Sequence, residues 1–579
     1  MSKFFITNNK SLYRDIKKQV ELSPFDICFS KEDKISCLTT KKIMVDHKNA
    51  KEEGNGFVAI TGTMVWGDGL RVDDTVLNEI WNIYKGDINE IRKACIGNYA
   101  VSIVDNDNGC VFSDISGFYN IYYYSKNDNW IISNSLYDLY LVLKKELTLD
   151  KFSVIEFMRQ SSILNGDSQF NEIKRLRGFD FLRFKSDKLE CIIDNIEYPH
   201  AQGNLEEQVS KYVDFSKDYA AKTYNAFGIP TISMTGGLDA RMLLSSYLSI
   251  GVKPDIYYGK GNSFLTNTYN QDLNIDRIYR DRFGLQLYES SWATPDPMDQ
   301  FWDKYLDYFG FSYDIYSSSD AVMESVLNNP NIYFILGEGG EMLRNLPWVD
   351  NRNTDYFTLE EFINEYYAPQ ELTDSIVDKN DFLNHIRKKC LDICNYYQLN
   401  PEHIATEDVF FLTLEHRKTA DSQTLNWMNL IRYDSIQMIE YDGLLQTRLG
   451  YKDTSNAKFM LHCQNLMYPD VLDVPFFSRC KMRTFDRQTM SLKPMSSIVQ
   501  NLKEKMRQSM PFLFSFIRKY FYRDAIQRNP INEKVYNRAL ELYDIFNKQE
   551  LFNLEKFTDK RYLIKYVMFL YAINKNKKN

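Results

Sequence analysis

The segment from Ile232 to Leu244 places the strongest constraint on the fold of this chain. Its letters, ISMTGGLDARMLL, describe a short apolar strand, a turn with two glycines and the start of a helix. Such a unit points backbone N–H groups at an anion. Thr235 can donate its hydroxyl to a phosphate, and the glycines let that phosphate approach the backbone. Asp239 is placed to hold a divalent cation. Taken alone, the segment is equally compatible with a purely structural turn.

A second segment of the same kind occupies residues 333–344, with the letters YFILGEGGEMLR. An apolar strand again ends in a glycine-rich turn, here with two carboxylates. In a doubly wound sheet both turns would lie at the carboxyl ends of parallel strands, where ligands bind. Asp239 and Glu341 would then share Mg²⁺ and neutralise a polyphosphate.

A third segment, residues 270–278, follows a predicted strand at residues 255–259. It fits a nucleotide-facing turn between strand and helix. Exposed Asp and Arg side chains on a helix explain its letters equally well.

The organisation of the chain changes near residue 200. Short β-rich runs broken by Asp, Asn and Gly extend from Gly56 to Val142 and predict antiparallel strands. From Leu205 onward, long helical periodicities alternate with brief apolar strands, which is typical of an α/β unit. After about residue 360 the pattern is almost wholly helical. We therefore expect two large domains, 1–200 and 201–579.

Charge and composition exclude several classes of protein. The 70 basic and 78 acidic residues give a net charge of −8, and the basic residues are dispersed, so a nucleic-acid partner is not expected. No stretch reaches the roughly 18 apolar residues that a membrane span needs, and the N-terminal letters lack a signal peptide, so we expect a cytoplasmic protein without a membrane span. The nine scattered cysteines predict reduced thiols.

The order and spacing of these segments resemble the asparagine synthetase family, which includes beta-lactam synthetases and lasso-peptide cyclases. Residues 235–241, TGGLDAR, resemble the family's pyrophosphate-binding motif, SGGLDS or SGGxDSR, and residues 337–341, GEGGE, resemble its GEGSD segment. Residues 458–481 resemble its C-terminal helix, proline turn and catalytic lysine. In the N-terminal part, residues 97–105, 113–117 and 131–135 resemble a class II glutamine amidotransferase domain.

The resemblance implies a fold and a chemistry. Residues 1–200 would form an Ntn-hydrolase-like αββα sandwich. Residues 201–579 would form a PP-loop domain, similar to the adenine nucleotide alpha hydrolases, with a parallel sheet and a large helical extension. ATP would transfer AMP to a substrate carboxylate with release of pyrophosphate, and an amine would then attack the acyl-adenylate.

The same resemblance implies roles for individual residues. Asp239 and Glu341 would bind Mg²⁺, Glu338 would assist or orient the attacking amine, and Lys481 would stabilise the charged transition state. Because Arg479 and Arg483 flank it, Lys481 also fits an exposed basic loop. The ATP-binding set comprises Ser233, Thr235, Gly236, Gly237, Asp239, Arg241, Gly259, Asp272, Gly337 and Gly339.

Several departures from the family pattern bear on activity. Glutamine-using members carry Cys after the initiator Met, but position 2 is Ser2, and the NGEIYN-like glutamine-binding segment is missing, with residues 61–66 in its place. A Ser hydroxyl is far less ionised than a thiol, so glutaminase activity is not expected. Ala240 replaces a family Ser and Met342 replaces an acid. Losing one hydrogen bond to a charged group costs about 1.5–3 kcal/mol, which weakens ATP binding without excluding it.

Three other features have a structural and a functional interpretation. Cys390 and Cys394 share a helix face and fit a metal pair, but buried thiols explain them better in the absence of a second pair. His416 fits a surface or packing residue better than a base. Residues 510–517, apolar with basic flanks, fit a core segment better than a membrane or partner surface.

The expected function is an ATP-dependent carbon–nitrogen ligase that works without glutamine. Its substrate would be a small molecule or peptide with a carboxylate and an amine. Lactam or macrolactam closure, or amidation in specialised-metabolite, peptide or surface-glycan biosynthesis, would fit. Two alternatives stay open: an ammonia-dependent asparagine-type synthetase, and a degenerate scaffold that keeps the fold. A partner protein or a homodimer also stays open.

Overall fold

The structure is a computed structural model of the 579-residue chain. It describes residues 2–84, 87–194, 204–258, 266–289, 298–311, 320–343, 355–367, 377–440, 443, 457–478, 481–494, 530–546 and 560–574.

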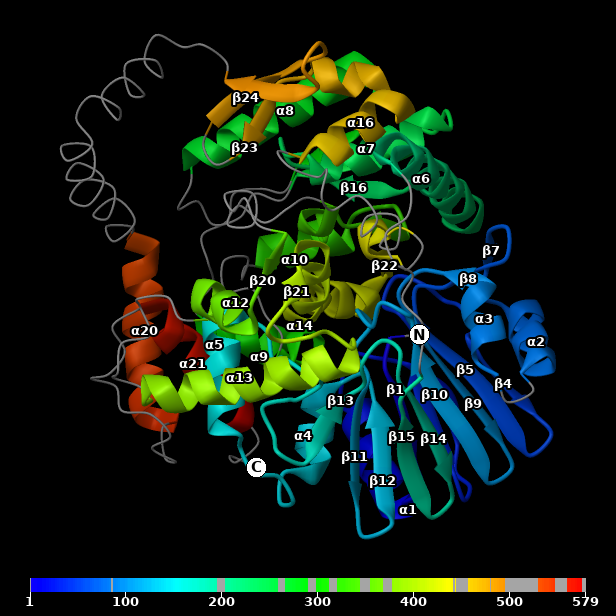
Figure 1. Cartoon of the computed structure of the whole chain (residues 1–579). Helices are drawn as coiled ribbons and strands as arrows, with labels where there is room; N and C mark the ends of the chain where they lie inside the picture. The colour runs from blue at the N-terminus through cyan, green and yellow to red at the C-terminus, as the bar shows by residue number, and fades with distance from the viewer. Residues whose placement is uncertain are drawn as a thin grey trace.

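Two six-stranded sheets with antiparallel neighbours form the N-terminal part of the molecule (Figure 1). The first has the order β13 (Ile173–Arg175), β11 (Tyr122–Lys126), β12 (Asn129–Ser133), β1 (Phe4–Thr7), β3 (Ser36–Thr40), β2 (Ile27–Lys31). The second has the order β15 (Lys188–Ile192), β14 (Phe181–Lys185), β10 (Asn108–Ser113), β9 (Tyr99–Asp105), β5 (Gly56–Gly62), β4 (Ala50–Glu53). Alternate residues of both sheets meet in a shared core, where the rings of Trp130 and Phe184 lie 4.7 Å apart.

Helices cover the outer faces of both sheets. In α1 (Lys10–Glu21) the buried residues Tyr13, Ile16 and Val20 recur at helical spacing, and the helix packs on the first sheet together with α4 (Leu136–Leu143). The second sheet carries α2 (Asp74–Ile83), whose N-terminus is capped by Asp73, and α3 (Asn89–Lys93). The layers are therefore helix, sheet, sheet, helix.

The second half of the chain contains a five-stranded parallel sheet. Its order is β18 (Leu287–Glu289), β17 (Asp255–Tyr258), β16 (Thr231–Ser233), β19 (Tyr333–Ile335), β22 (Tyr433–Ser435). The chain runs outward from β16 to one edge, crosses back and continues with β19 on the other side. This is the strand arrangement of a doubly wound sheet.

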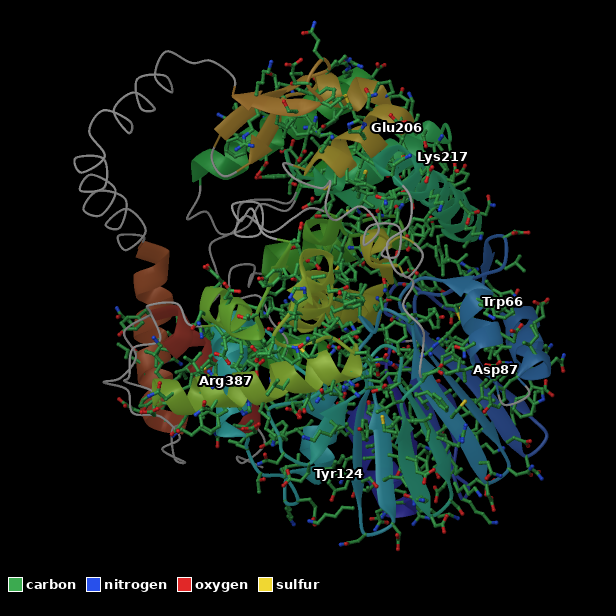
Figure 2. The ribbon with its side chains drawn as sticks, in the orientation of Figure 1. Trp66, Asp87, Tyr124, Glu206, Lys217 and Arg387 are labelled. Carbon is green, nitrogen blue, oxygen red and sulfur yellow. The ribbon has the colours of Figure 1, made fainter. Side chains whose placement is uncertain are left out.

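Helices pack on both faces of the parallel sheet. The face with Ile232, Ile256 and Ile335 is covered by α6 (Leu205–Phe227), α7 (Asp239–Ser249), α8 (Thr266–Phe283) and α16 (Lys458–Met467). The face with Tyr257 and Phe334 is covered by α9 (Met298–Phe309), α10 (Asp320–Leu327) and α14 (Val409–Ile431). Figure 1 shows α16, from late in the chain, beside α6 and α7, and Figure 2 marks α6 by Glu206 and Lys217.

The chain after residue 360 is less uniformly helical than its sequence predicts. It does contain long helices, among them α13 (Lys379–Tyr396), α20 (Pro530–Phe546) and α21 (Lys560–Asn574). It also contains β21 (Ile404–Ala405), paired with β20 (Tyr356–Phe357), the strand β22, and a three-stranded antiparallel meander of β23 (Phe476–Ser478), β24 (Lys481–Asp486) and β25 (Ser491–Pro494). These strands are short and mix polar with apolar letters, so they lack the clean alternation that marks a half-buried strand.

The sandwich and the parallel sheet are joined by buried polar contacts. Lys42 of the sandwich donates hydrogen bonds to the carbonyls of Asn429 and Arg432 at the end of α14, at 2.6 and 3.0 Å. Its amino group thus satisfies carbonyls that a helix C-terminus leaves without partners. Asn98 accepts a hydrogen bond from the backbone of Ile436, at 2.9 Å.

The change of architecture falls between Ile192, the last residue of the sandwich, and Leu205, the first residue of α6. The expected boundary near residue 200 itself lies outside the described residues.

Within the described part of the chain, no helix combines the length and the apolar character that a membrane crossing requires. Residues 510–517 also lie outside the described part.

Candidate functional site

The two glycine-rich segments meet at the centre of the parallel sheet. Strands β16 and β19 are direct neighbours, with Ile232 paired to Ile335, and they are the strands at which the winding direction reverses. Ligands of open α/β sheets bind in the crevice at such a switch point, beyond the carboxyl ends of the strands. The turn after β16 and the turn after β19 both lie at that position.

Asp239 of the first turn and Gly340 of the second pack against each other. A Cβ atom placed on Gly340 would stand 2.2 Å from Cγ of Asp239 and 2.4 Å from its Oδ1. Gly337 also packs on α7, less tightly, because its Cβ would stand 3.2 Å from the backbone nitrogen of Ala240. Only glycine lets the second turn pack this closely on the start of α7.

The start of α7 can receive an anion. Asp239 is the first residue of the helix, and no side chain caps the helix at Leu238. Thr235 is exposed at the mouth of the turn, and its hydroxyl lies 3.4 Å from the Gly237 nitrogen. The first-turn N–H groups of α7 and the Thr235 hydroxyl therefore remain the groups that a phosphate would contact.

The backbone of Gly236 is bonded within the protein, whereas the sequence predicts that Gly236 contacts phosphate. Its N–H donates to Asp272 Oδ1 at 2.8 Å, and its carbonyl accepts from the Phe477 N–H at 2.9 Å. A Cβ on Gly236 would stand 2.6 Å from Ile275. Both backbone groups of Gly236 are thus used within the protein, so this glycine fixes the turn instead of contacting phosphate.

Residues 270–278 lie within α8 and do not form the expected turn. Asp272 faces the phosphate turn from this helix. Burial raises the pKa of its carboxyl, and the hydrogen bond from Gly236 partly opposes the rise. Asp276, one helical turn further on, is fully buried. Burial and the nearby Asp272 raise the pKa of Asp276 well above its usual value, against the opposing charge of Arg241.

Arg241, which the sequence predicts to contact ATP, is bonded to another segment of the chain. Its side chain is fully buried, and its guanidinium donates to the carbonyls of Val471 and Val474, both at 2.7 Å, and of Pro475, at 3.0 Å. The guanidinium carbon lies 3.5 Å from the centre of the Phe476 ring. Arg241 binds the chain segment that leads into β23 and has no surface toward the crevice.

The structure describes only some of the remaining residues that the sequence predicts for the site. Ser233 ends β16 opposite Tyr257, and Glu338 is half-buried in the second turn, where Gly339 has a φ of 79°. The backbone of Glu341 lies in a 3₁₀ turn directly after Gly340. Lys481 begins β24, paired with Ser478. The side chains of Glu341, Met342 and Lys481 and the whole of Gly259 lie outside the described residues.

Gln464 belongs to this site although sequence reasoning missed it. It is a fully buried side chain of α16, and its Nε2 donates to the Leu238 carbonyl at 2.9 Å. Gln464 thereby holds the residue just before α7. No local signal distinguishes Gln464 from the other polar residues of Lys458–Met467.

Ser2 occupies a closed position in the sandwich. Its side chain is fully buried and donates to the Lys41 carbonyl at 2.7 Å, while it also contacts the Thr40 hydroxyl. Its carbonyl accepts from Asn134 at 2.8 Å. Among the described residues, the Ser2 hydroxyl is thus bonded to a backbone carbonyl and to another hydroxyl. The loss of a glutaminase nucleophile stays a prediction.

The other features singled out by sequence have structural roles. Cys390 and Cys394 are both buried in α13, and the described residues contain no group of three or more His, Cys, Asp or Glu side chains suited to a metal ion. His416 is half-buried, and its Nδ1 lies 3.0 Å from the Tyr367 hydroxyl. These observations fit roles in packing for Cys390, Cys394 and His416.

A small cavity of about 50 Å³ lies between the sandwich and the helices α9 and α14. Asn120, Asn134 and Asn426 line it together with Tyr308 and Trp427. The amides of these asparagines bond within the protein, for example Asn120 to Ser422 at 3.1 Å. None of the residues that line the cavity belongs to the turns after β16 and β19.

Comparisons with known proteins give no family for the chain. No family model matches it, and no curated protein matches it. Among solved structures, it is similar to a glutamine phosphoribosylpyrophosphate amidotransferase from B. subtilis complexed with ADP and GMP, at 7% identity and a TM-score of 0.24, over 50% of this chain and 65% of that one. It is also similar to a structure described as the allosteric regulatory enzyme of purine biosynthesis, at 8% identity and a TM-score of 0.24, over 55% of this chain and 84% of that one. Similarity at this level carries no inference about activity.

Proposed function

We propose that this chain is an ATP-dependent amide-forming ligase of the asparagine synthetase type. A substrate carboxylate attacks the α-phosphate of ATP and displaces pyrophosphate, and an amine then attacks the acyl-adenylate and displaces AMP. The observation that carries this proposal is the contact of Asp239 with Gly340. It brings a carboxylate from one glycine-rich turn against the residue before Glu341 in the other, at the switch point of a parallel sheet.

The residues at this position suit the proposed chemistry. The uncapped start of α7 and the Thr235 hydroxyl would hold phosphate oxygens. Asp239 and Glu341 supply the hard oxygen ligands that Mg²⁺ prefers, and Mg²⁺, when bound, would neutralise charge on the polyphosphate. Glu338 would orient the amine and accept its proton, and Lys481 would stabilise negative charge that develops at the α-phosphate.

The source of the amine follows from the sandwich. Because the Ser2 hydroxyl is buried and bonded to Lys41, we infer that the N-terminal domain releases no ammonia from glutamine. The amine then belongs to the substrate itself or to a second small molecule. Closure of a lactam or macrolactam, or amidation of a metabolite, peptide or surface glycan, fits this requirement.

Exchange of radiolabelled pyrophosphate into ATP tests the proposal. Wild-type protein is incubated with Mg²⁺, ATP and a panel of carboxylates that includes amino acids, β-amino acids and linear peptides. We expect exchange that depends on one class of carboxylate and disappears in Asp239→Asn, but not in Asp470→Asn, which changes an exposed aspartate. Turnover of aspartate with ammonium would identify an asparagine-type synthetase instead. Absence of both exchange and ATP binding would overturn the proposal in favour of a scaffold.

A further inference from the structure

Arg241 connects the phosphate turn to a segment far away in the sequence. It lies on α7, two residues after Asp239, and its two Nη atoms donate to three carbonyls around the end of the 3₁₀ turn Pro469–Asp473, those of Val471, Val474 and Pro475. The Phe476 ring closes over the guanidinium at 3.5 Å. A planar group with several fixed donors is suited to this task, and an ammonium group cannot reproduce its geometry.

The segment held by Arg241 leads directly to the candidate lysine. Phe476 begins β23, and the next residue donates its N–H to the Gly236 carbonyl at 2.9 Å. Strand β23 then pairs with β24 from Ser478 and Lys481 onward. The hairpin is therefore fastened to the phosphate turn at two points, a side-chain clamp at Arg241 and a backbone bond at Gly236.

Side chains of α8 enclose the clamp. The ring centre of Tyr279 lies 5.1 Å from the guanidinium carbon of Arg241. Neither the Nε of Arg241 nor the carboxyl oxygens of Asp276 form a hydrogen bond within the described residues. The hydrogen bonds of Arg241 are therefore those of its Nη atoms to the carbonyls of the segment.

We propose that Arg241 is a positioning residue, which holds the segment 471–477 on α7 and so sets the position of the β23–β24 hairpin, whose second strand begins at Lys481, relative to the phosphate turn. This inference rests on the proposed function and deepens it. Loss of the clamp should displace the hairpin and slow adenylate formation. It should leave the affinity for Mg·ATP nearly unchanged, because the N–H groups of α7 stay in place.

Arg241→Lys provides the test, with Arg282→Lys as the matched control. Arg282 contacts the same segment through Asp473 at 2.8 Å, but both side chains are exposed, and such pairs contribute little. Phe476→Leu serves as a second variant if Arg241→Lys does not fold. Each variant is examined for hydrogen exchange of residues 476–494, for Mg·ATP affinity by calorimetry and for the rate of pyrophosphate exchange.

We expect faster hydrogen exchange across the hairpin in Arg241→Lys and Phe476→Leu, with an affinity for Mg·ATP within a few-fold of wild type. A displacement of the hairpin by about 1 Å would lower the rate of pyrophosphate exchange about 100-fold. The inference would be overturned if the affinity for Mg·ATP fell in parallel with the rate of pyrophosphate exchange. It would also be overturned if hydrogen exchange of the hairpin were unchanged in a folded variant. If wild-type protein binds no ATP, the proposed function fails, and the hydrogen exchange still decides whether Arg241 holds the hairpin.

Discussion

Gly340 lies so close to Asp239 that any side chain at position 340 would overlap the Asp239 carboxylate. The carboxylate of the first glycine-rich turn therefore packs directly on the backbone of the second. In a nucleotide site the two turns would bind one ligand together, and neither would be sufficient alone.

Replacing Gly340 by alanine tests this contact. The new Cβ would stand 2.2 Å from Asp239 Cγ, so the carboxylate must move, and we expect Mg·ATP affinity to fall by at least about tenfold, or 1.4 kcal/mol. Gly251→Ala, after the end of α7, is the comparison, since nothing lies within 4 Å of its Cβ. Calorimetry should show a much smaller loss in that variant. Equal affinities in wild type and a folded Gly340→Ala would disprove the shared site.

Ser2 should behave as a structural residue. We expect no release of glutamate from glutamine by wild-type protein or by Ser2→Cys, because the side chain at this position points into a closed network with Thr40 and Lys41. Ser2→Ala should destabilise the sandwich by about 0.5–1.5 kcal/mol, the usual contribution of a buried hydrogen bond. A coupled glutamate assay checks the first expectation. Hydrolysis that disappears in Ser2→Ala would show that the sandwich is an active glutaminase.

The buried pair Glu415 and Lys418 should make stability depend on pH in a defined way. Burial alone would raise the pKa of Glu415, but Lys418, at 2.7 Å, and the Tyr397 hydroxyl outweigh it and hold the pKa below its usual value. The ionised carboxylate therefore stabilises the fold at neutral pH, and this contribution is lost as the pH falls through the folded-state pKa.

Glu415→Gln leaves the Lys418 ammonium buried without a carboxylate, which costs about 3–5 kcal/mol at neutral pH. The difference in melting temperature from wild type should stay constant from pH 8 to pH 5. It should narrow only below about pH 4, where Glu415 of the wild type takes up a proton. Glu402→Gln, at an exposed position of the preceding loop, should match wild type throughout. If the difference in melting temperature between wild type and Glu415→Gln narrowed already between pH 8 and pH 6, this would contradict a lowered pKa of Glu415.

Lys42 should contribute to the attachment of the sandwich to α14. Lys42→Met removes its hydrogen bonds to the carbonyls of Asn429 and Arg432. Buried hydrogen bonds contribute about 0.5–1.5 kcal/mol each, so we expect faster hydrogen exchange in the last turns of α14 and lower resistance to denaturant. Lys48→Met changes a largely exposed lysine and should have neither effect. If hydrogen exchange of α14 were unchanged in Lys42→Met, the hydrogen bonds of Lys42 to the end of α14 would be dispensable for the attachment.

The sequence predicts the parts of this molecule in which local pattern and tertiary structure agree. The strand, glycine turn and helix around Gly236 are recognisable because apolar runs and glycines mark them in any context. The roles of Arg241, Asp272 and Gln464 depend on segments that lie far apart in the chain, which no local pattern records. Arg241 illustrates this: a motif predicts a phosphate ligand, whereas the carbonyls of the segment after α16 occupy its guanidinium.

Some short strands likewise cannot be predicted from local sequence pattern. Strand β5 has the length and the apolar character that identify it, but β23 has only three residues and depends on its bond to Gly236. The region before Gly56, with α1 and four strands, also escaped the sequence interpretation, since its strands carry many polar letters that become buried between layers. Thr39 and Thr40 are examples of such fully buried polar residues.

Calorimetric titration of Mg·ATP into wild type and Asp239→Asn tests the central claim most directly. The claim is that the ends of β16 and β19 form one nucleotide site with Asp239 at its centre. It predicts Mg²⁺-dependent binding of ATP at one site per chain, lost in Asp239→Asn while the melting temperature without ligand is retained. Equal binding by Asp239→Asn and wild type, or no binding by the wild-type protein, would contradict it.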